Sequence, residues 1–102
     1  MVENVAEWAA ATIDAAAATR VKYLDLNQAS TDYVNAIGES EGEKYDLSEG
    51  DSTHLNPSGE KVFGRMTLDL LLEARGDLGE YFEQHEALSE KIANGEFATG
   101  DE

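Results

Sequence analysis

Hydrophobic residues recur at helical spacing near the start of the chain. Trp8 and Ala9 follow Val5 by three and four residues, and Ile13 follows Ala9 by four, which places them on one side of a helix. Alanine, the strongest helix former, fills most of the positions between them. Residues 3–18 are therefore predicted to form a helix, and Trp8 is expected to lie in the core.

A short apolar segment with a different pattern follows this helix. Residues 21–26 read Val-Lys-Tyr-Leu-Asp-Leu, begin with a β-branched residue and are apolar on both faces, as in a buried parallel strand. Asn27 is then expected to cap a second helix that carries Ala29 and Tyr33 on its apolar face and ends near Gly38. The order helix, strand, helix predicts an α/β fold, although the chain is predominantly helical.

The single predicted strand has a consequence for the fold. A strand cannot satisfy its own backbone groups, because its N–H and C=O groups need a neighbouring strand. No second segment of the chain has a comparable strand pattern. Either residues 21–26 are not a strand, or the partner strands lie outside these residues, and we expect the second.

The second half of the chain contains a long polar loop and two more predicted helices. Residues 39–54 are rich in glycine, serine and acids, and an irregular loop of this length is often functional. Asn56 and Pro57 then mark the start of a helix, and Arg75 lies in its last turn. A last helix is predicted around residues 81–93.

Composition and charge limit the classes of function. Among 102 residues, 22 are acidic and 7 are basic, which gives a formal net charge of −15. Such a chain lacks the clustered cations that bind nucleic acid, and it is repelled by anionic membranes. With no cysteine there is no thiolate nucleophile, and no cofactor or metal site is expected. Residues 1–18 also lack the basic-then-apolar order of a signal peptide.

The strongest candidate for chemistry is the sequence Asp51-Ser-Thr-His54. An aspartate three residues before a histidine can accept a hydrogen bond from one ring nitrogen, which leaves the other nitrogen free to take a proton from a serine hydroxyl. The alternative interpretation is an Asp-Ser turn beside a solvent-exposed histidine. His85, the other histidine, is expected to be an exposed helical residue.

The context of this motif resembles a known family. Residues 23–27, and the block Gly-Asp-Ser-Thr-His-Leu-Asn-Pro-Ser-Gly at 50–59, are similar to the C-terminal portion of SGNH (GDSL-type) hydrolases, most of all the rhamnogalacturonan acetylesterase branch. The resemblance covers roughly residues 3–73. It implies a three-layer αβα, flavodoxin-like fold, with Asp51 as the orienting acid and His54 as the general base.

The same resemblance implies an activity and shows what is missing for it. The family members are secreted serine esterases, and this branch removes acetyl groups from a pectic polysaccharide. Their serine nucleophile and oxyanion-hole residues come from blocks that have no counterpart here. Ser52 is a poor nucleophile candidate, because it is too near in sequence to His54 for its hydroxyl to reach the accepting nitrogen.

The resemblance implies that the chain has two segments, and it leaves more than one possible function. Residues 1–76 would be the C-terminal part of an esterase domain, and residues 77–102 an acidic helical extension whose last residues, 95–102, are expected to fray. We expect the chain to be inactive without the missing N-terminal half of the domain, its expected partner. A lipase or acylhydrolase acting on small or lipid esters is an alternative enzyme. A noncatalytic acidic helical interaction domain is the alternative outside enzymes.

Overall fold

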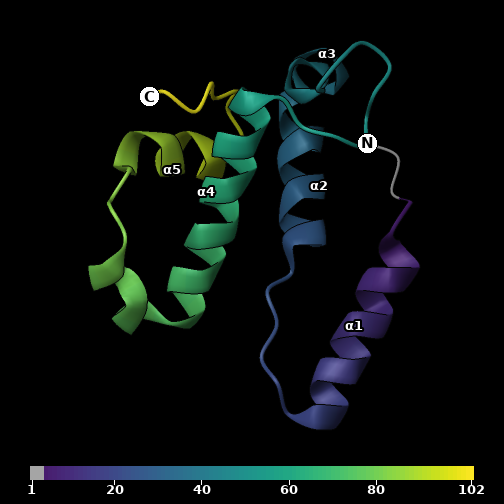
Figure 1. Cartoon of the computed structure of the whole chain (residues 1–102), viewed down its shortest axis with the longest axis vertical. Helices are drawn as coiled ribbons and strands as arrows, with labels where there is room; N and C mark the ends of the chain where they lie inside the picture. Colours follow the sequence, from purple (N-terminus) through teal and green to yellow (C-terminus); the bar gives the residue numbers. More distant parts are fainter. Residues whose placement is uncertain (1–3) are drawn as a thin grey trace.

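A computed structural model describes residues 4–102 and shows a predominantly helical domain (Figure 1). Its elements, in chain order, are α1 (Ala6–Thr19), α2 (Leu26–Ile37), α3 (Glu39–Gly42), η1 (Glu43–Tyr45), α4 (Pro57–Ala74), η2 (Gly76–Tyr81) and α5 (Glu86–Ala93), where η denotes a 3₁₀ helix. None of the described helices combines the length and the apolar character needed to cross a bilayer.

The strand predicted at residues 21–26 is not formed, which corrects the sequence interpretation. Residues 21–25 have no regular structure, and Leu26 already belongs to α2. The cap of α2 is Asp25 and not Asn27, because the Asp25 carboxylate accepts a hydrogen bond from the amide of Gln28 at 3.0 Å. Within residues 4–102 there is no β-sheet to which the segment could be added, so the αβα architecture is not seen.

Helix α1 forms as predicted but does not pack as predicted. Its last turn closes on Arg20, which has a left-handed backbone (φ 58°), and the amide of Val21 donates to the carbonyl of Ala16 at 2.9 Å. The side chain of Trp8 is 74% exposed, so its expected place in the core is wrong. No other helix packs extensively along α1, which lies to one side of the molecule in Figure 1.

The hydrophobic core lies between α2, α4, α5, η1 and the C-terminal residues. Tyr33 of α2 is buried, as the sequence predicted, and packs edge-on against Phe63 with ring centroids 6.2 Å apart. Tyr45 makes a similar edge contact with Phe63 at 5.4 Å. The buried members of this core are Tyr33, Tyr45, Val62, Met66, Leu88 and Ala98.

Helix α4 begins as its sequence predicts. The Asn56 side chain accepts a hydrogen bond from the amide of Gly59 at 2.9 Å, and Pro57 occupies the first turn, where no amide donor is required. The helix ends at Ala74, one residue before the predicted end. The last predicted helix starts at Glu86 and not at residue 81, because Tyr81 ends η2 and residues 82–85 are not helical.

The C-terminal residues are ordered against the core, in contrast to the predicted frayed tail. Ala98 is 0% exposed, and its carbonyl accepts a hydrogen bond from the Tyr45 hydroxyl at 2.6 Å. The Tyr33 hydroxyl donates to the carbonyl of Glu96 at 2.9 Å, and Phe97 stacks on Tyr45 with centroids 5.2 Å apart. Two buried tyrosine hydroxyls need polar partners, and the backbone of the C-terminal segment supplies them.

The side chain of Glu102 fixes the end of this segment. Burial alone would raise the pKa of its carboxyl group, but hydrogen bonds from the amides of Thr99 and Gly100 and from Lys91 outweigh that effect and lower the pKa to about 2. The carboxylate therefore stays ionised and closes a turn over residues 99–102. We call residues 96–102 the C-terminal strap.

Candidate functional site

The candidate residues lie in the loop between η1 and α4, residues 46–56. An isolated antiparallel bridge joins Asp46 to Leu55, and the amide of Leu47 donates to the carbonyl of His54 at 3.0 Å. Near the far end of the loop, the amide of Asp51 donates to the carbonyl of Ser48 at 3.0 Å. These bonds hold the loop in a narrow, hairpin-like conformation. The candidate residues Asp51 and His54 lie toward its tip.

The base of the loop is tied to the core. The amide of Asn56 donates to the carbonyl of Tyr45 at 2.9 Å, and its side-chain nitrogen donates to the carbonyl of Lys44 at 2.7 Å. Gly59 is buried against this junction, and a Cβ atom there would lie 3.0 Å from the Tyr45 oxygen and 3.1 Å from Leu55. A larger residue at position 59 would therefore push the start of α4 and the loop apart by a few tenths of an ångström.

The structure brings Asp51 and His54 together, as their spacing predicts. The His54 Nδ1 atom lies 3.1 Å from Asp51 Oδ2 and 3.3 Å from Oδ1. Because an ionised carboxylate can only accept a hydrogen bond, Nδ1 is the donor in this contact. In the neutral ring, Nε2 is then left as the proton acceptor.

Backbone amides fix the carboxylate of Asp51. Its Oδ1 atom accepts hydrogen bonds from the amides of His54 and Thr53, both at 3.0 Å. These two bonds, and after them the hydrogen bond to the His54 ring, lower the pKa of Asp51 below its usual value. Asp51 therefore remains an acceptor over the whole neutral range and holds one orientation of the imidazole.

The imidazole itself faces solvent. The His54 side chain is 70% exposed, whereas that of Asp51 is 27% exposed. Within residues 4–102 no serine hydroxyl forms a hydrogen bond with His54, and Ser52 is exposed. The pair can therefore orient a ring and accept a proton, but a nucleophile would have to reach Nε2 from elsewhere.

His85 differs from its predicted environment. It precedes α5 at the N-cap position and is half-buried, not an exposed helical residue. Its Nδ1 atom is buried and has no hydrogen-bond partner among the described residues. The sequence carried no signal for this burial, which arises from the approach of α5 to α4.

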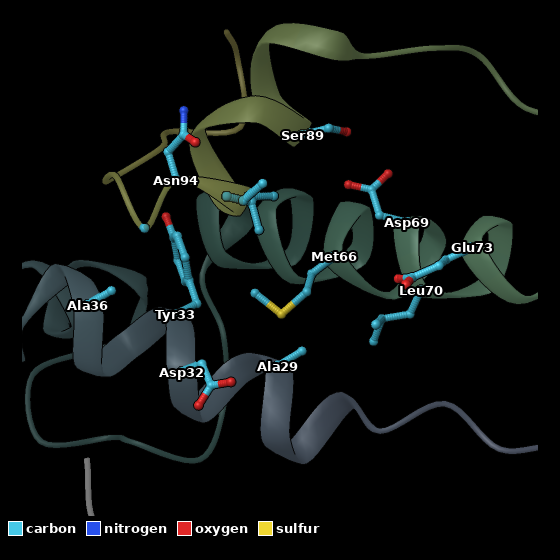
Figure 2. A pocket seen from close by; sticks show the side chains of 13 residues that line it. Ala29, Asp32, Tyr33, Ala36, Met66, Asp69, Leu70, Glu73, Ser89 and Asn94 are labelled. Carbon is cyan, nitrogen blue, oxygen red and sulfur yellow. The ribbon is translucent and has the colours of Figure 1, made fainter.

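A hollow between three helices is separate from the Asp51–His54 pair. It lies between α2, α4 and α5, has a volume of about 510 Å³, and has Met66 and Leu70 within it and carboxylates at its edge (Figure 2). Neither Asp51 nor His54 lines it. Among the described residues no three histidine, aspartate or glutamate side chains are grouped closely enough to hold a metal ion.

Sequence reasoning did not identify the residues that support the pair. Tyr45 connects the loop to the core, yet it belongs to no motif that would mark it. Gly59 ends the block at 50–59, but the sequence did not show that it packs against the base of the loop. The amide of Thr53 also binds Asp51, and this contact could have been found, because aspartate commonly accepts from an amide two residues later.

Comparisons with known proteins give no relative for this chain. No protein-family model matches it, and neither a curated protein nor a solved structure resembles it significantly. The similarity to SGNH hydrolases is therefore the motif resemblance around Asp51 and His54 and stays a prediction.

Proposed function

We propose that Asp51 and His54 are the acid and the general base of a serine ester hydrolase whose nucleophile lies in a polypeptide segment outside these residues. The observation that carries the proposal is the geometry of the pair. Nδ1 of His54 is engaged by Asp51 at 3.1 Å, while the ring is 70% exposed and presents Nε2 outward. An oriented imidazole with one free nitrogen is what nucleophilic catalysis by serine requires.

The loop supports this role, because it holds the pair without help from other surface groups. Two backbone amides and the ring itself bind the Asp51 carboxylate, so its position follows from the loop backbone. The loop in turn is joined to the core through Asn56 and Tyr45. A base held in one orientation loses little freedom when a substrate and a nucleophile approach.

The proposed reaction is acyl transfer in two steps. The serine oxygen attacks the ester carbonyl while its proton moves to Nε2 of His54, and Asp51 stabilises the imidazolium. The imidazolium then gives the proton to the leaving alcohol as the ester C–O bond breaks. Water repeats the sequence on the acyl-enzyme and releases the acid and the free serine.

The substrate class comes from the family resemblance. We propose acetyl esters on a pectic polysaccharide, in a secreted protein, with lipid or other small esters as the competing substrates. The chain as described lacks a nucleophile beside His54, so the proposal requires that it be inactive alone.

The test uses the longer polypeptide, which we define as this chain together with the coding region that precedes Met1 in its genome. We expect it to release acetate from acetylated pectin, and to be labelled by a fluorophosphonate on a serine before Met1. His54→Ala should lower kcat by about 10²–10⁴-fold, the range for loss of a general base.

His85→Ala is the matched control, because it removes the other histidine of the chain. It should leave kcat within twofold of the parent. A longer polypeptide that hydrolyses no ester, or one in which His54→Ala is as active as the parent, would contradict the proposal and favour a noncatalytic interaction domain. Faster cleavage of 4-nitrophenyl octanoate than of acetylated pectin would show that lipid or other small esters are the substrates. The proposed mechanism would be unchanged.

A further inference from the structure

The hollow between α2, α4 and α5 has an apolar interior. Its volume of about 510 Å³ is in the range of sites that take small molecules, which often lie between helices. The side chain of Met66, which is 3% exposed, lies between α4 and α2 in Figure 2. Ala29, Leu70 and Ile92 add hydrocarbon from all three helices. A ligand with a hydrocarbon part would bury that part against this interior and away from water.

One end of the hollow is closed by a close contact between α2 and the turn after α5. Gly95 has φ 69°, and an added Cβ atom there would lie 2.8 Å from the Cβ of Ala36. Ala36 and Glu73 lie at opposite ends of the hollow in Figure 2. The Tyr33 hydroxyl is already engaged, because it donates to a backbone carbonyl at 2.9 Å. A ligand in the hollow therefore meets a fixed wall at the Ala36 end.

The edge of the hollow carries three carboxylates and, within residues 4–102, no cationic side chain. Asp32 belongs to α2, and Asp69 and Glu73 belong to α4 on the other side of the hollow (Figure 2). Arg65 pairs with Asp69 at 2.9 Å and neutralises that carboxylate in part. Asp32 accepts only from the neutral amide of Gln28, at 2.8 Å. The edge is therefore negative, and the net charge of −15 on the whole chain adds to its potential.

Glu73 occupies a position that favours a neighbouring cation. It lies in the last turn of α4, where the exposed carbonyl groups give the helix end a partial negative charge. No lysine or arginine of the described part of the chain pairs with its carboxylate, and the nearby Arg75 pairs with Asp77 at 2.7 Å instead. A carboxylate at this end of a helix is destabilising by itself and is stabilised by an added positive charge.

We propose that this hollow binds a small organic cation, an alkylammonium or arylalkylammonium ion. Its hydrocarbon part packs against Met66 and Leu70, and its ammonium group lies between Asp32 and Glu73. The apolar interior supplies affinity, while carboxylates from two helices select a cation over a neutral or anionic molecule of the same shape.

The same observations disfavour other ligands and separate the hollow from the proposed function. A metal ion is a poor occupant, because the described residues offer no group of three carboxylate or histidine ligands. An anion would be repelled by the edge of the hollow. Neither Asp51 nor His54 lines the hollow, so cation binding does not depend on ester hydrolysis.

Titration of the chain with 4-phenylbutylammonium tests the proposal. The ε-methyl group of Met66 reports binding by NMR, because the chain has only 2 methionines and the signal can be assigned with Met66→Leu. We expect this signal to shift with a Kd of about 1 mM, as for a ligand of this size. The Kd should rise several fold at high salt. The uncharged 4-phenylbutan-1-ol should bind about fivefold more weakly, and 4-phenylbutanoate more weakly still.

The two unneutralised carboxylates are tested with a charge-matched control. Asp32→Asn combined with Glu73→Gln should raise the Kd of 4-phenylbutylammonium by about tenfold at low salt. Asp14→Asn combined with Glu80→Gln changes the net charge equally, but both residues are exposed and lie outside the hollow. This control should change the Kd by less than about twofold.

The apolar interior is tested with Leu70→Ala, which should raise the Kd by about threefold because it removes hydrocarbon that the ligand contacts. Leu68→Ala is the matched control, since Leu68 is also half-buried on α4 but does not line the hollow. Its Kd should equal that of the parent. Circular dichroism of each variant establishes that the helices are retained.

Three results would overturn the proposal. The first is a Met66 signal that stays unmoved at about 10 mM 4-phenylbutylammonium, or an equal Kd for the amine and the alcohol. The second is an equal effect of the two double variants, which would show that only the overall charge attracts the cation. The third is a lysine-containing peptide that moves the Met66 signal at a lower concentration than the amine does, which would assign the hollow to a side chain of a protein partner.

Discussion

The N-terminal arm, which we define as α1 together with residues 20–25, and the rest of the chain differ in what stabilises them. Helix α1 is rich in alanine and forms through local propensity, but its one tryptophan is 74% exposed. Tyr45, by contrast, lies in a 3₁₀ helix of three residues and is held by rings and hydrogen bonds from distant parts of the chain. A helix can therefore be formed without being packed, and a packed residue needs little regular structure.

The dimensions of the molecule agree with this contrast. Its radius of gyration is 14.3 Å, while a compact domain of this length is expected near 13 Å. Helix α1, along which no other helix packs extensively, lies to one side of the molecule in Figure 1. Substitutions in the arm should therefore have small effects on the stability of this chain, and substitutions around the C-terminal strap large ones.

The largest predicted effect is that of Tyr45→Ala. The substitution empties a fully enclosed site beside Phe63 and Phe97 and removes the hydrogen bond to Ala98, so the free energy of unfolding should fall by about 3–5 kcal/mol. Trp8→Ala deletes a larger side chain from the arm, but it should change the free energy of unfolding by less than about 0.5 kcal/mol. Urea denaturation followed by circular dichroism measures both.

Tyr81→Ala is the control for residue type, because Tyr81 is exposed and lies outside the core. Its effect on the free energy of unfolding should be as small as that of Trp8→Ala. Equal losses of stability for Tyr45→Ala and Trp8→Ala would show that the arm packs in solution and would remove the contrast between the two regions.

Gly100→Ala should have the next largest effect, because the strap approaches α4 closely at this glycine. Gly100 has φ 94°, and an added Cβ would lie 2.6 Å from the Cβ of Lys61. Strain and overlap together should cost about 1–3 kcal/mol. Gly79→Ala, where an added Cβ meets nothing within 4 Å, is the matched control and should be nearly neutral by the same urea measurement.

An unchanged urea midpoint for Gly100→Ala would mean that the strap moves away from α4 at little cost. The strap would then contribute as little to the stability of the chain as the arm does.

The pH dependence of the strap gives a smaller effect. The pKa of Glu102 is about 2 in the folded chain against 4.5 as its ordinary value, so its contribution to stability is present above about pH 4.5 and is lost as the pH falls through 2. Glu102→Gln should be less stable than the parent by about 1 kcal/mol at pH 6, since a partly solvated charged hydrogen bond is worth that much.

The difference between parent and Glu102→Gln should shrink below pH 4.5 and vanish near pH 2. Comparing the two proteins at each pH cancels the repulsion among the other acidic residues. Glu80→Gln, which removes an exposed carboxylate outside the strap, should give a difference that is small at every pH. A constant difference for Glu102→Gln would show that its carboxylate does not hold the strap.

What the sequence predicts correctly is local. The start of α4 follows from Asn56 and Pro57, which act within one turn, and the contact between Asp51 and His54 follows from a spacing of three residues. A strand at 21–26 and a core position for Trp8 both require packing partners distant in the sequence. Those partners are absent from the described residues, so the local pattern alone did not decide the outcome.

The C-terminal strap shows the opposite error. Its residues, Glu-Phe-Ala-Thr-Gly-Asp-Glu at 96–102, have the composition of a frayed end. Their order comes from the hydroxyls of Tyr33 and Tyr45, which lie more than 50 residues earlier in the chain. Contacts over such separations leave no periodic pattern, and for the same reason the support that Tyr45 gives to the candidate loop was not foreseen.

The smallest predicted change in stability is that of Asp51→Asn, but it tests the candidate site most directly. An asparagine side-chain oxygen can still accept from the amides of Thr53 and His54, so the loop should keep its shape and the urea midpoint should not change measurably. The neutral amide binds the ring more weakly than a carboxylate. The ¹⁵N shifts of His54 should therefore move from the tautomer protonated at Nδ1 toward the mixture found in a free imidazole.

Trp8→Ala should leave these shifts unchanged, because the loop is tied to the packed region through Tyr45 and Asn56 and not to the arm. In the parent protein, the hydrogen bond from His54 Nδ1 to Asp51 should persist at neutral pH, because Asp51 has a pKa below its usual value and stays ionised there. An imidazole with the same tautomer mixture in parent and Asp51→Asn would mean that the carboxylate does not orient the ring. His54 would then be an exposed histidine beside an aspartate turn, and the candidate pair would lose the property on which its proposed function depends.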